Sequence, residues 1–125
     1  AAGMGADEIC ILSATGSRLD HSAGNILLLS GLLDKNIRGW IEDANNRVCL
    51  TRGRIELERL DNWKVSLIAL SPEVRGLTTE GLSYPLKDYT LKLGSCLGIS
   101  NEFASDTAAV SFDEGLLMVI LSRDE

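Results

Sequence analysis

The chain has 125 residues, of which 45% are hydrophobic and 24% charged, the balance of one ordinary globular domain that buries its own core. Its net charge of −6 argues against binding to nucleic acid or to an anionic membrane, since both need clustered Lys and Arg. The three cysteines, Cys10, Cys49 and Cys96, are widely spaced and fit neither a disulfide framework nor a zinc motif. Their apolar, strand-like surroundings predict three buried thiols and a cytoplasmic protein.

The first fifty residues follow a strand–loop–helix–strand pattern. Glu8–Ala14 is a short apolar run that predicts a buried, parallel strand. The break at Thr15–Ser17 leads into a predicted helix over Leu19–Asp34, whose apolar residues recur at helical spacings and for which Ser17 is a candidate cap. Ile37–Asp43 predicts a second strand, so this part is typical of an α/β layer.

From about residue 50 the pattern changes to short β-type runs separated by turn residues. Arg54–Glu58 alternates strictly between polar and apolar side chains, which suits a half-exposed antiparallel strand. The other predicted strands are Val48–Thr51, Val65–Leu70, Thr90–Leu93, Ala108–Phe112 and Leu116–Leu121. No further helix is expected. We therefore predict an α/β remnant at residues 1–50, followed by an all-β sandwich or barrel at residues 51–125.

Arg18, Asp20 and His21 follow the first predicted strand, at the start of the predicted helix. Ligands of α/β sheets bind at the carboxyl ends of strands, and a helix N-terminus offers N–H groups to an anion. Arg18 is suited to phosphate oxygens and Asp20 to Mg²⁺. The alternative is that Asp20 only helps to cap the helix and Arg18 is solvated. His21 is the single histidine and suits a base, a ligand or a structural role.

A second candidate segment is the loop over Gly94–Glu102. Within it, Ser100 and Asn101 supply donors and acceptors that suit an aminopyrimidine edge or a hydroxyl, or else satisfy their own backbone in a structured turn. Trp63 precedes a predicted strand and suits either stacking on a cationic ring or core packing. Trp40 lies inside an apolar strand and is expected to pack.

The order of these segments resembles that of the thiamine pyrophosphokinases. Ile11–Leu29 reads ILSATGSRLDHSAGNILLL and is similar to that family's G-G-R-x-D-H segment, with Ser17 in place of the second glycine. Farther on, similar segments follow in the family's order: VSLIALS, GLTTEGLSYPL, GSCLGISNEF and GLLMVILSRD. The resemblance covers nearly the whole chain.

This resemblance implies an enzyme that transfers a pyrophosphoryl group from ATP to thiamine, with Mg²⁺, to give thiamine diphosphate and AMP. It implies that residues 1–50 belong to a nucleotide-handling catalytic domain and residues 51–125 to a thiamine-binding β-sandwich. Arg18 and Asp20 would be catalytic, with Asp20 also at the metal. Ser100 and Asn101 would hold thiamine, together with His21 and an aromatic residue near the Val65 strand, for which Trp63 is the candidate. The family is homodimeric, with each active site formed between the two subunits.

The family's upstream G-D-x-D-S and D-x-T-D segments are absent from this sequence, which enters a strand almost at once. We therefore expect a fragment that shows no appreciable transfer activity alone. Two other functions stay open. One is a β-domain that dimerises or binds thiamine without catalysis, and the other is a purely structural β-domain.

Overall fold

The computed structural model describes residues 8–12 and 19–123 and begins with a strand–helix–strand unit. Strand β1 (Glu8–Leu12) pairs in parallel with β2 (Arg38–Glu42), and helix α1 (Leu19–Leu33) connects them. The pairing confirms that the first predicted strand is parallel. Helix α1 ends at Leu33, one residue before the predicted end at Asp34. The proposed cap, Ser17, lies outside the described residues. A left-handed Asn36 follows the helix, and the Ile37 N–H donates to the Leu32 carbonyl oxygen at 2.9 Å, which turns the chain into β2.

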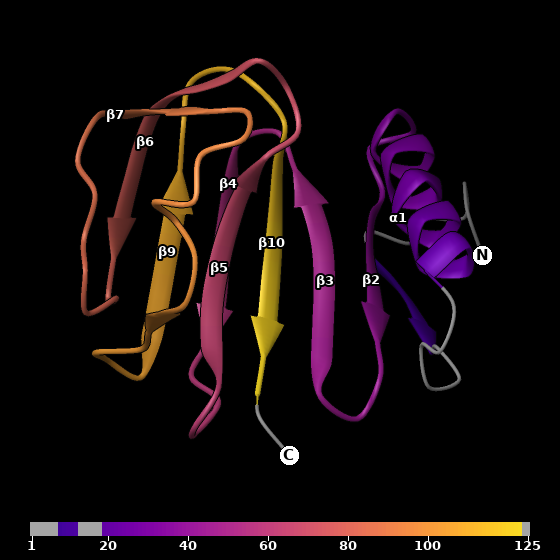
Figure 1. Ribbon diagram of the computed structural model, residues 1–125, viewed down its shortest axis with the longest axis horizontal. Coiled ribbons are helices and arrows are strands. Elements are labelled where there is room, and N and C mark those ends of the chain that lie inside the picture. Colours follow the sequence, from indigo (N-terminus) through magenta and orange to yellow (C-terminus); the bar gives the residue numbers. More distant parts are fainter. Residues whose placement is uncertain (1–7, 13–18, 124–125) are drawn as a thin grey trace.

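Strand β2 also begins the antiparallel part of the same sheet. It turns into β3 (Asn46–Thr51), which pairs with β10 (Leu117–Ser122). Next come β5 (Lys64–Ala69) and the two-residue β8 (Asn101–Glu102), so that the six-stranded order is β1-β2-β3-β10-β5-β8. Strand β3 therefore crosses residue 50, the boundary predicted between the two parts. Figure 1 shows this sheet with α1 at the end opposite β5.

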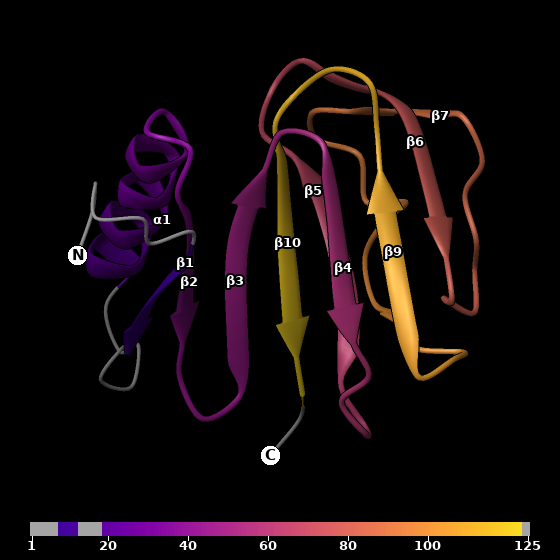
Figure 2. The ribbon, with the colours of Figure 1, turned by 180° about the vertical axis from the view of Figure 1, so that it is seen from behind.

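The second sheet has four strands. Its order is β4 (Arg54–Glu58), β9 (Thr107–Ser111), β6 (Glu73–Glu80) and β7 (Tyr89–Lys92). Along β4 the side chains alternate between exposed and buried, as the sequence predicted. Figure 2, seen from behind, shows β4 and β9 in front of the first sheet. Strands β6 and β8 were not among the predicted strands.

The main hydrophobic core lies between the two sheets, which confirms the sandwich. Its largest fully buried side chains come from both sheets: Ile55, Leu77, Leu91 and Val110 from the second sheet, and Leu67, Leu117 and Val119 from the first. Trp40 packs against this core, as expected. On the other face of the first sheet, Leu29 of α1 and Leu50 of β3 are also buried.

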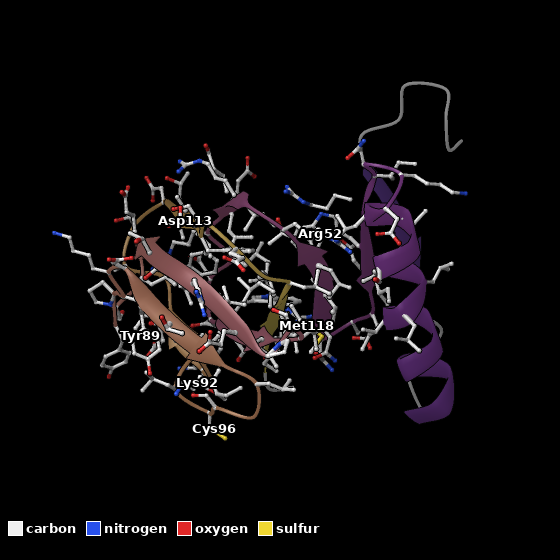
Figure 3. The ribbon with its side chains drawn as sticks, turned by 90° about the horizontal axis from the view of Figure 1, so that it is seen from above. Arg52, Tyr89, Lys92, Cys96, Asp113 and Met118 are labelled. Atoms are coloured by element: carbon white, nitrogen blue, oxygen red, sulfur yellow. The ribbon has the colours of Figure 1, made fainter. Side chains whose placement is uncertain are left out.

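The cysteines divide between the core and the surface. Cys49 is buried in β3, as predicted, whereas Cys96 is exposed. The prediction of a buried Cys96 is wrong because the residue lies in the turn after β7 and not in a strand; Figure 3 shows it at the rim of the molecule, near Lys92. Cys10 lies in β1, where side chains are not described. Within the described part of the chain, no helix is long and apolar enough to cross a membrane.

Candidate functional site

The three predicted residues near the N-terminus fall at the start of α1. Arg18 lies outside the described residues. Asp20 and His21 lie in the first turn of α1, the helix that follows the carboxyl end of β1, but the structure describes their backbone alone. Their roles in catalysis, metal binding and substrate binding therefore stay predictions. Among the residues that the structure describes, no three His, Cys, Asp or Glu side chains are grouped to hold a metal ion.

The loop that carries Ser100 is fixed onto strand β5. The Leu67 N–H donates to the Gly98 carbonyl oxygen at 2.8 Å, and the Ser100 N–H donates to the Ser66 hydroxyl oxygen at 2.9 Å. Gly98 packs so closely that a Cβ there would lie 2.5 Å from the Leu67 carbonyl oxygen. Ser100 adopts a left-handed φ of 62° and is exposed, so its hydroxyl is open to a ligand.

The Asn101 side chain forms hydrogen bonds with both the N–H and the carbonyl oxygen of Tyr84. Its Oδ1 accepts hydrogen bonds from the Tyr84 N–H at 3.0 Å and from the Glu102 N–H at 2.9 Å. Its Nδ2 donates to the Tyr84 carbonyl oxygen at 2.8 Å. An amide Nδ2 carries two hydrogens, so one donor remains for a ligand. Asn101 therefore binds mainly the backbone of a loop 17 residues away, and only its bond to the Glu102 N–H matches the predicted alternative of a turn that satisfies its own backbone.

Tyr84 is the residue that sequence reasoning missed. Its side chain is 70% exposed, although the segment around it is firmly held. The Ser83 N–H donates to the Glu102 carbonyl oxygen at 2.8 Å, and Leu82 bridges to Phe103. An exposed aromatic ring on a fixed backbone offers a surface for stacking, and the backbone of Tyr84 is held by Asn101, the residue after Ser100. A tyrosine directly before a proline, in a segment bounded by glycine, was the sequence signal for a surface position.

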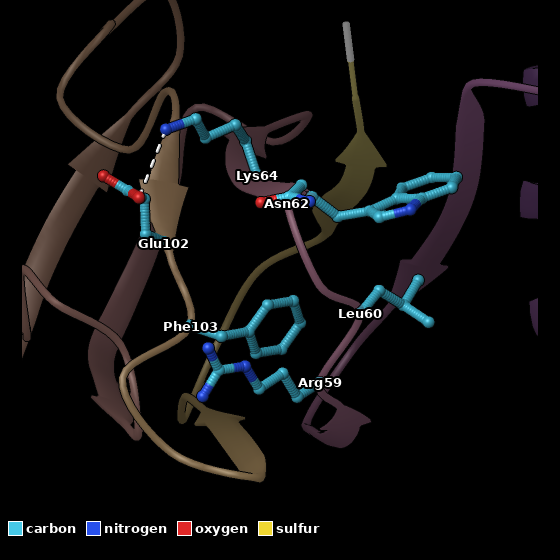
Figure 4. A pocket seen from close by; sticks show the side chains of 7 residues that line it. Arg59, Leu60, Asn62, Lys64, Glu102 and Phe103 are labelled. Carbon is cyan, nitrogen blue, oxygen red and sulfur yellow. Dashed lines mark ion pairs between the residues drawn. The ribbon is translucent and has the colours of Figure 1, made fainter. Parts of the chain in front are cut away.

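Trp63 occupies a different place, on a polar cleft. The cleft has a volume of about 270 Å³ and is lined by Arg59, Leu60, Asn62, Trp63, Lys64, Glu102 and Phe103. Figure 4 shows Lys64 reaching toward Glu102, with Arg59 near Phe103. The Arg123 guanidinium already stacks on the Trp63 ring, 5.2 Å from its centroid. A second cation on that ring would be repelled by the positive charge of Arg123. The geometry therefore favours Tyr84 over Trp63 for stacking on a cationic ligand.

These features define a class: a two-sheet β-sandwich whose candidate ligand-binding edge is formed by β5, β8 and the segment around Tyr84. Comparison with known proteins identifies the family. Residues 54–117 match the family described as thiamin pyrophosphokinase, vitamin B1 binding domain, and the chain belongs to it. The match includes Trp63, Tyr84, Ser100 and Asn101. It begins at residue 54 and therefore does not include Arg18, Asp20 or His21.

Relatives of known structure share the whole arrangement. Thiamine pyrophosphokinase of Bacillus subtilis is 37% identical over 120 residues, which are 94% of this chain and 56% of that protein. The chain thus spans about half the length of the curated relative. The crystal structure of the Bacillus subtilis protein matches with a TM-score of 0.89 at 36% identity, covering 95% of this chain and 56% of that one. That of the Geobacillus thermodenitrificans protein matches with a TM-score of 0.85 at 35% identity, covering 98% and 57%.

Proposed function

We propose that this chain binds thiamine through the edge of its β-sandwich and acts in a thiamine pyrophosphokinase. In that reaction a pyrophosphoryl group passes from ATP to the thiamine hydroxyl, giving thiamine diphosphate and AMP. The observation that carries the proposal is the exposed Tyr84, held at both its backbone N–H and carbonyl by Asn101, inside the segment that matches the vitamin B1 binding family. The name of the Bacillus subtilis relative supports the same activity.

The thiamine contacts follow from the chemistry of the ligand. Thiamine carries a flat pyrimidine and a cationic thiazolium, and the Tyr84 ring offers a face for stacking or for a cation–π contact. The Ser100 hydroxyl and the remaining Asn101 N–H supply hydrogen bonds to polar edges of the ligand. A net charge of −6 favours the approach of a cation. His21 remains a candidate for a further substrate contact, whereas the Trp63 ring, on which Arg123 already stacks, is not assigned to thiamine.

The transfer step is proposed for Arg18 and Asp20. Phosphoryl chemistry depends on positioning and charge neutralisation more than on a covalent nucleophile. Arg18 would hold phosphate oxygens of ATP, and the Asp20 carboxylate would orient the thiamine hydroxyl or bind Mg²⁺.

We also propose a homodimer in the cytoplasm. The resemblance implies an active site formed between two subunits, and exposed aliphatic side chains offer a surface for a partner. Leu93, Leu97 and Ile99 are all exposed, in the segment that leads from β7 to Ser100. Sedimentation equilibrium of the chain and of its Leu97→Glu variant tests this: a dimer is expected for the first and a monomer for the second.

Calorimetric titration of thiamine into the 125-residue chain tests the binding site. Tyr84→Ala should weaken binding roughly tenfold, the effect of losing about 1–2 kcal/mol of aromatic contact. Leu28→Ala, which removes an exposed apolar side chain of α1 outside both the proposed thiamine site and the proposed dimer surface, should leave the affinity unchanged. Equal affinities of the original chain and of Tyr84→Ala would exclude Tyr84 as the stacking ring.

A thiamine-binding domain without catalysis is the second candidate function. It is favoured by the family match, which covers residues 54–117 and none of the predicted catalytic residues. Release of AMP from ATP in the presence of Mg²⁺ and thiamine separates the two functions. If thiamine binds but no AMP is released by the complete gene product, the binding function is correct and the enzymatic one is wrong.

A further inference from the structure

The cleft beside Trp63 has a charge character opposite to that of the rest of the chain. The turn between β4 and β5 supplies Arg59 and Asn62, and the first residue of β5 is Lys64; all three line the cleft and carry N–H donors. Glu102 is the one carboxylate among the described residues that line it. A third cation, Arg123, stacks on Trp63. Positive side chains are therefore concentrated here, in a chain whose net charge is −6.

The ion pairs of these cations leave them available to a ligand. Arg59 pairs with Asp61 at 3.2 Å and Lys64 with Glu102 at 3.3 Å, and all four side chains are substantially exposed. Exposed pairs of this kind are weak, because water competes with each partner and the long side chains lose freedom when they are held. A ligand with a more concentrated negative charge can therefore replace either carboxylate.

We propose that this cleft binds the phosphate group of a small phosphorylated molecule. Arg59 would hold phosphate oxygens with its planar fork of donors, with Lys64 as a compact charge and the Asn62 amide as a neutral donor. Leu60 and Phe103 provide apolar wall for the organic part of the ligand. The volume of about 270 Å³ lies near the small end of ligand sites, which suits a compact molecule.

This site is separate from the proposed thiamine site and does not rest on it. Asn101 and Glu102 are neighbours in β8, and successive side chains of a strand point to opposite faces. Asn101 binds Tyr84, whereas Glu102 reaches Lys64 in the cleft. One strand thus divides a surface suited to a cation from a cleft suited to an anion.

The indole N–H groups of the two tryptophans provide the test. The ¹⁵N-labelled 125-residue chain is titrated with phenyl phosphate in a buffer without phosphate, at ionic strength matched with sodium chloride. The Trp63 indole signal should shift and saturate, while that of Trp40, which packs against the core and does not line the cleft, should not move. Phenol, the same ring without the anion, should cause no saturable shift. Thiamine should likewise leave the Trp63 signal in place.

Variants identify the donors. Arg59→Gln/Lys64→Gln should weaken binding roughly tenfold or more, because two charge-assisted contacts are lost. The matched control is Arg52→Gln/Arg54→Gln, which removes two exposed, ion-paired arginines outside the cleft, one in the β3–β4 turn and one at the start of β4, and should preserve the affinity. Circular dichroism verifies that both variants are folded. The proposal is overturned by an unshifted Trp63 signal, by equal shifts with phenol or thiamine, or by equal weakening in the control variant.

Discussion

Replacing Asn101 tests whether its side chain fixes the loop that presents Tyr84. Asn101→Ala removes three hydrogen bonds, two to Tyr84 and one to the Glu102 N–H. Each such bond is worth about 0.5–1.5 kcal/mol net, and these are exposed, so water satisfies the freed groups in part. We therefore expect a loss of about 1–2 kcal/mol in the free energy of unfolding, measured by urea denaturation with an unchanged slope. The Tyr84 amide should exchange its hydrogen roughly 5 to 30 times faster, and thiamine binding should weaken with it.

Ser100→Ala is the matched control for this experiment. The hydrogen bond that fixes Ser100 comes from its backbone N–H, so the alanine variant retains it, and the hydroxyl is exposed. The free energy of unfolding and the hydrogen-exchange rate of the Tyr84 amide should stay unchanged, and only thiamine binding should weaken. If Tyr84 exchange in Asn101→Ala equals that of the original chain, the side chain does not hold the loop and the reasoning fails.

Three further changes test the packing of the fold. Gly115→Ala should lower the free energy of unfolding by about 2 kcal/mol or more, because φ is 121° and a Cβ would lie 2.5 Å from a backbone oxygen, whereas Gly53→Ala, in open space, should be neutral in the same urea titration. Leu117→Ala should cost about 2–5 kcal/mol by thermal or urea unfolding, since the side chain is fully buried in the central strand β10; a smaller cost would mean that the core can collapse around it. Arg123→Ala should cost about 0.5–1 kcal/mol and shift Trp63 fluorescence, and an unaltered spectrum would contradict the stacking.

The sequence predicted the fold where one local pattern was sufficient. Arg54–Glu58 alternates because one face of β4 meets the core, and the strand was predicted at its observed bounds. Strand β6 was missed because Gly76, with a φ of 72°, interrupts it and the register with β7 shifts between Val74 and Leu77. Strand β8 is only two residues long, too short for any period to be visible in the sequence.

Only part of the candidate site could be predicted, because local patterns are visible in the sequence and contacts between distant residues are not. Ser100 and Asn101 were selected from their chemistry, because a polar pair in a small-residue loop is visible in the sequence alone, and their role in binding stays a prediction. Tyr84 was not found, because its place is set by hydrogen bonds to Asn101, 17 residues away. The sequence places Trp63 close to the predicted binding strand, but its surroundings include Arg123, 60 residues farther along the chain, and that contact appears only in three dimensions.

The pairing register of β8 determines which face of the strand carries Asn101 and which carries Glu102. It therefore positions one residue of each proposed site, although the two sites would bind ligands of opposite charge. Val65 pairs with Asn101 and Lys64 with Glu102, and a slip by one residue would exchange the faces of both side chains. Two residues cannot fix a register by themselves. Gly98, which packs onto Leu67, and the Ser100 N–H bond to Ser66 hold the preceding loop on the same strand, β5. The loop before β8 is therefore the element that keeps Asn101 toward Tyr84 and Glu102 in the cleft, so its small residues serve the packing of the fold as well as the proposed binding.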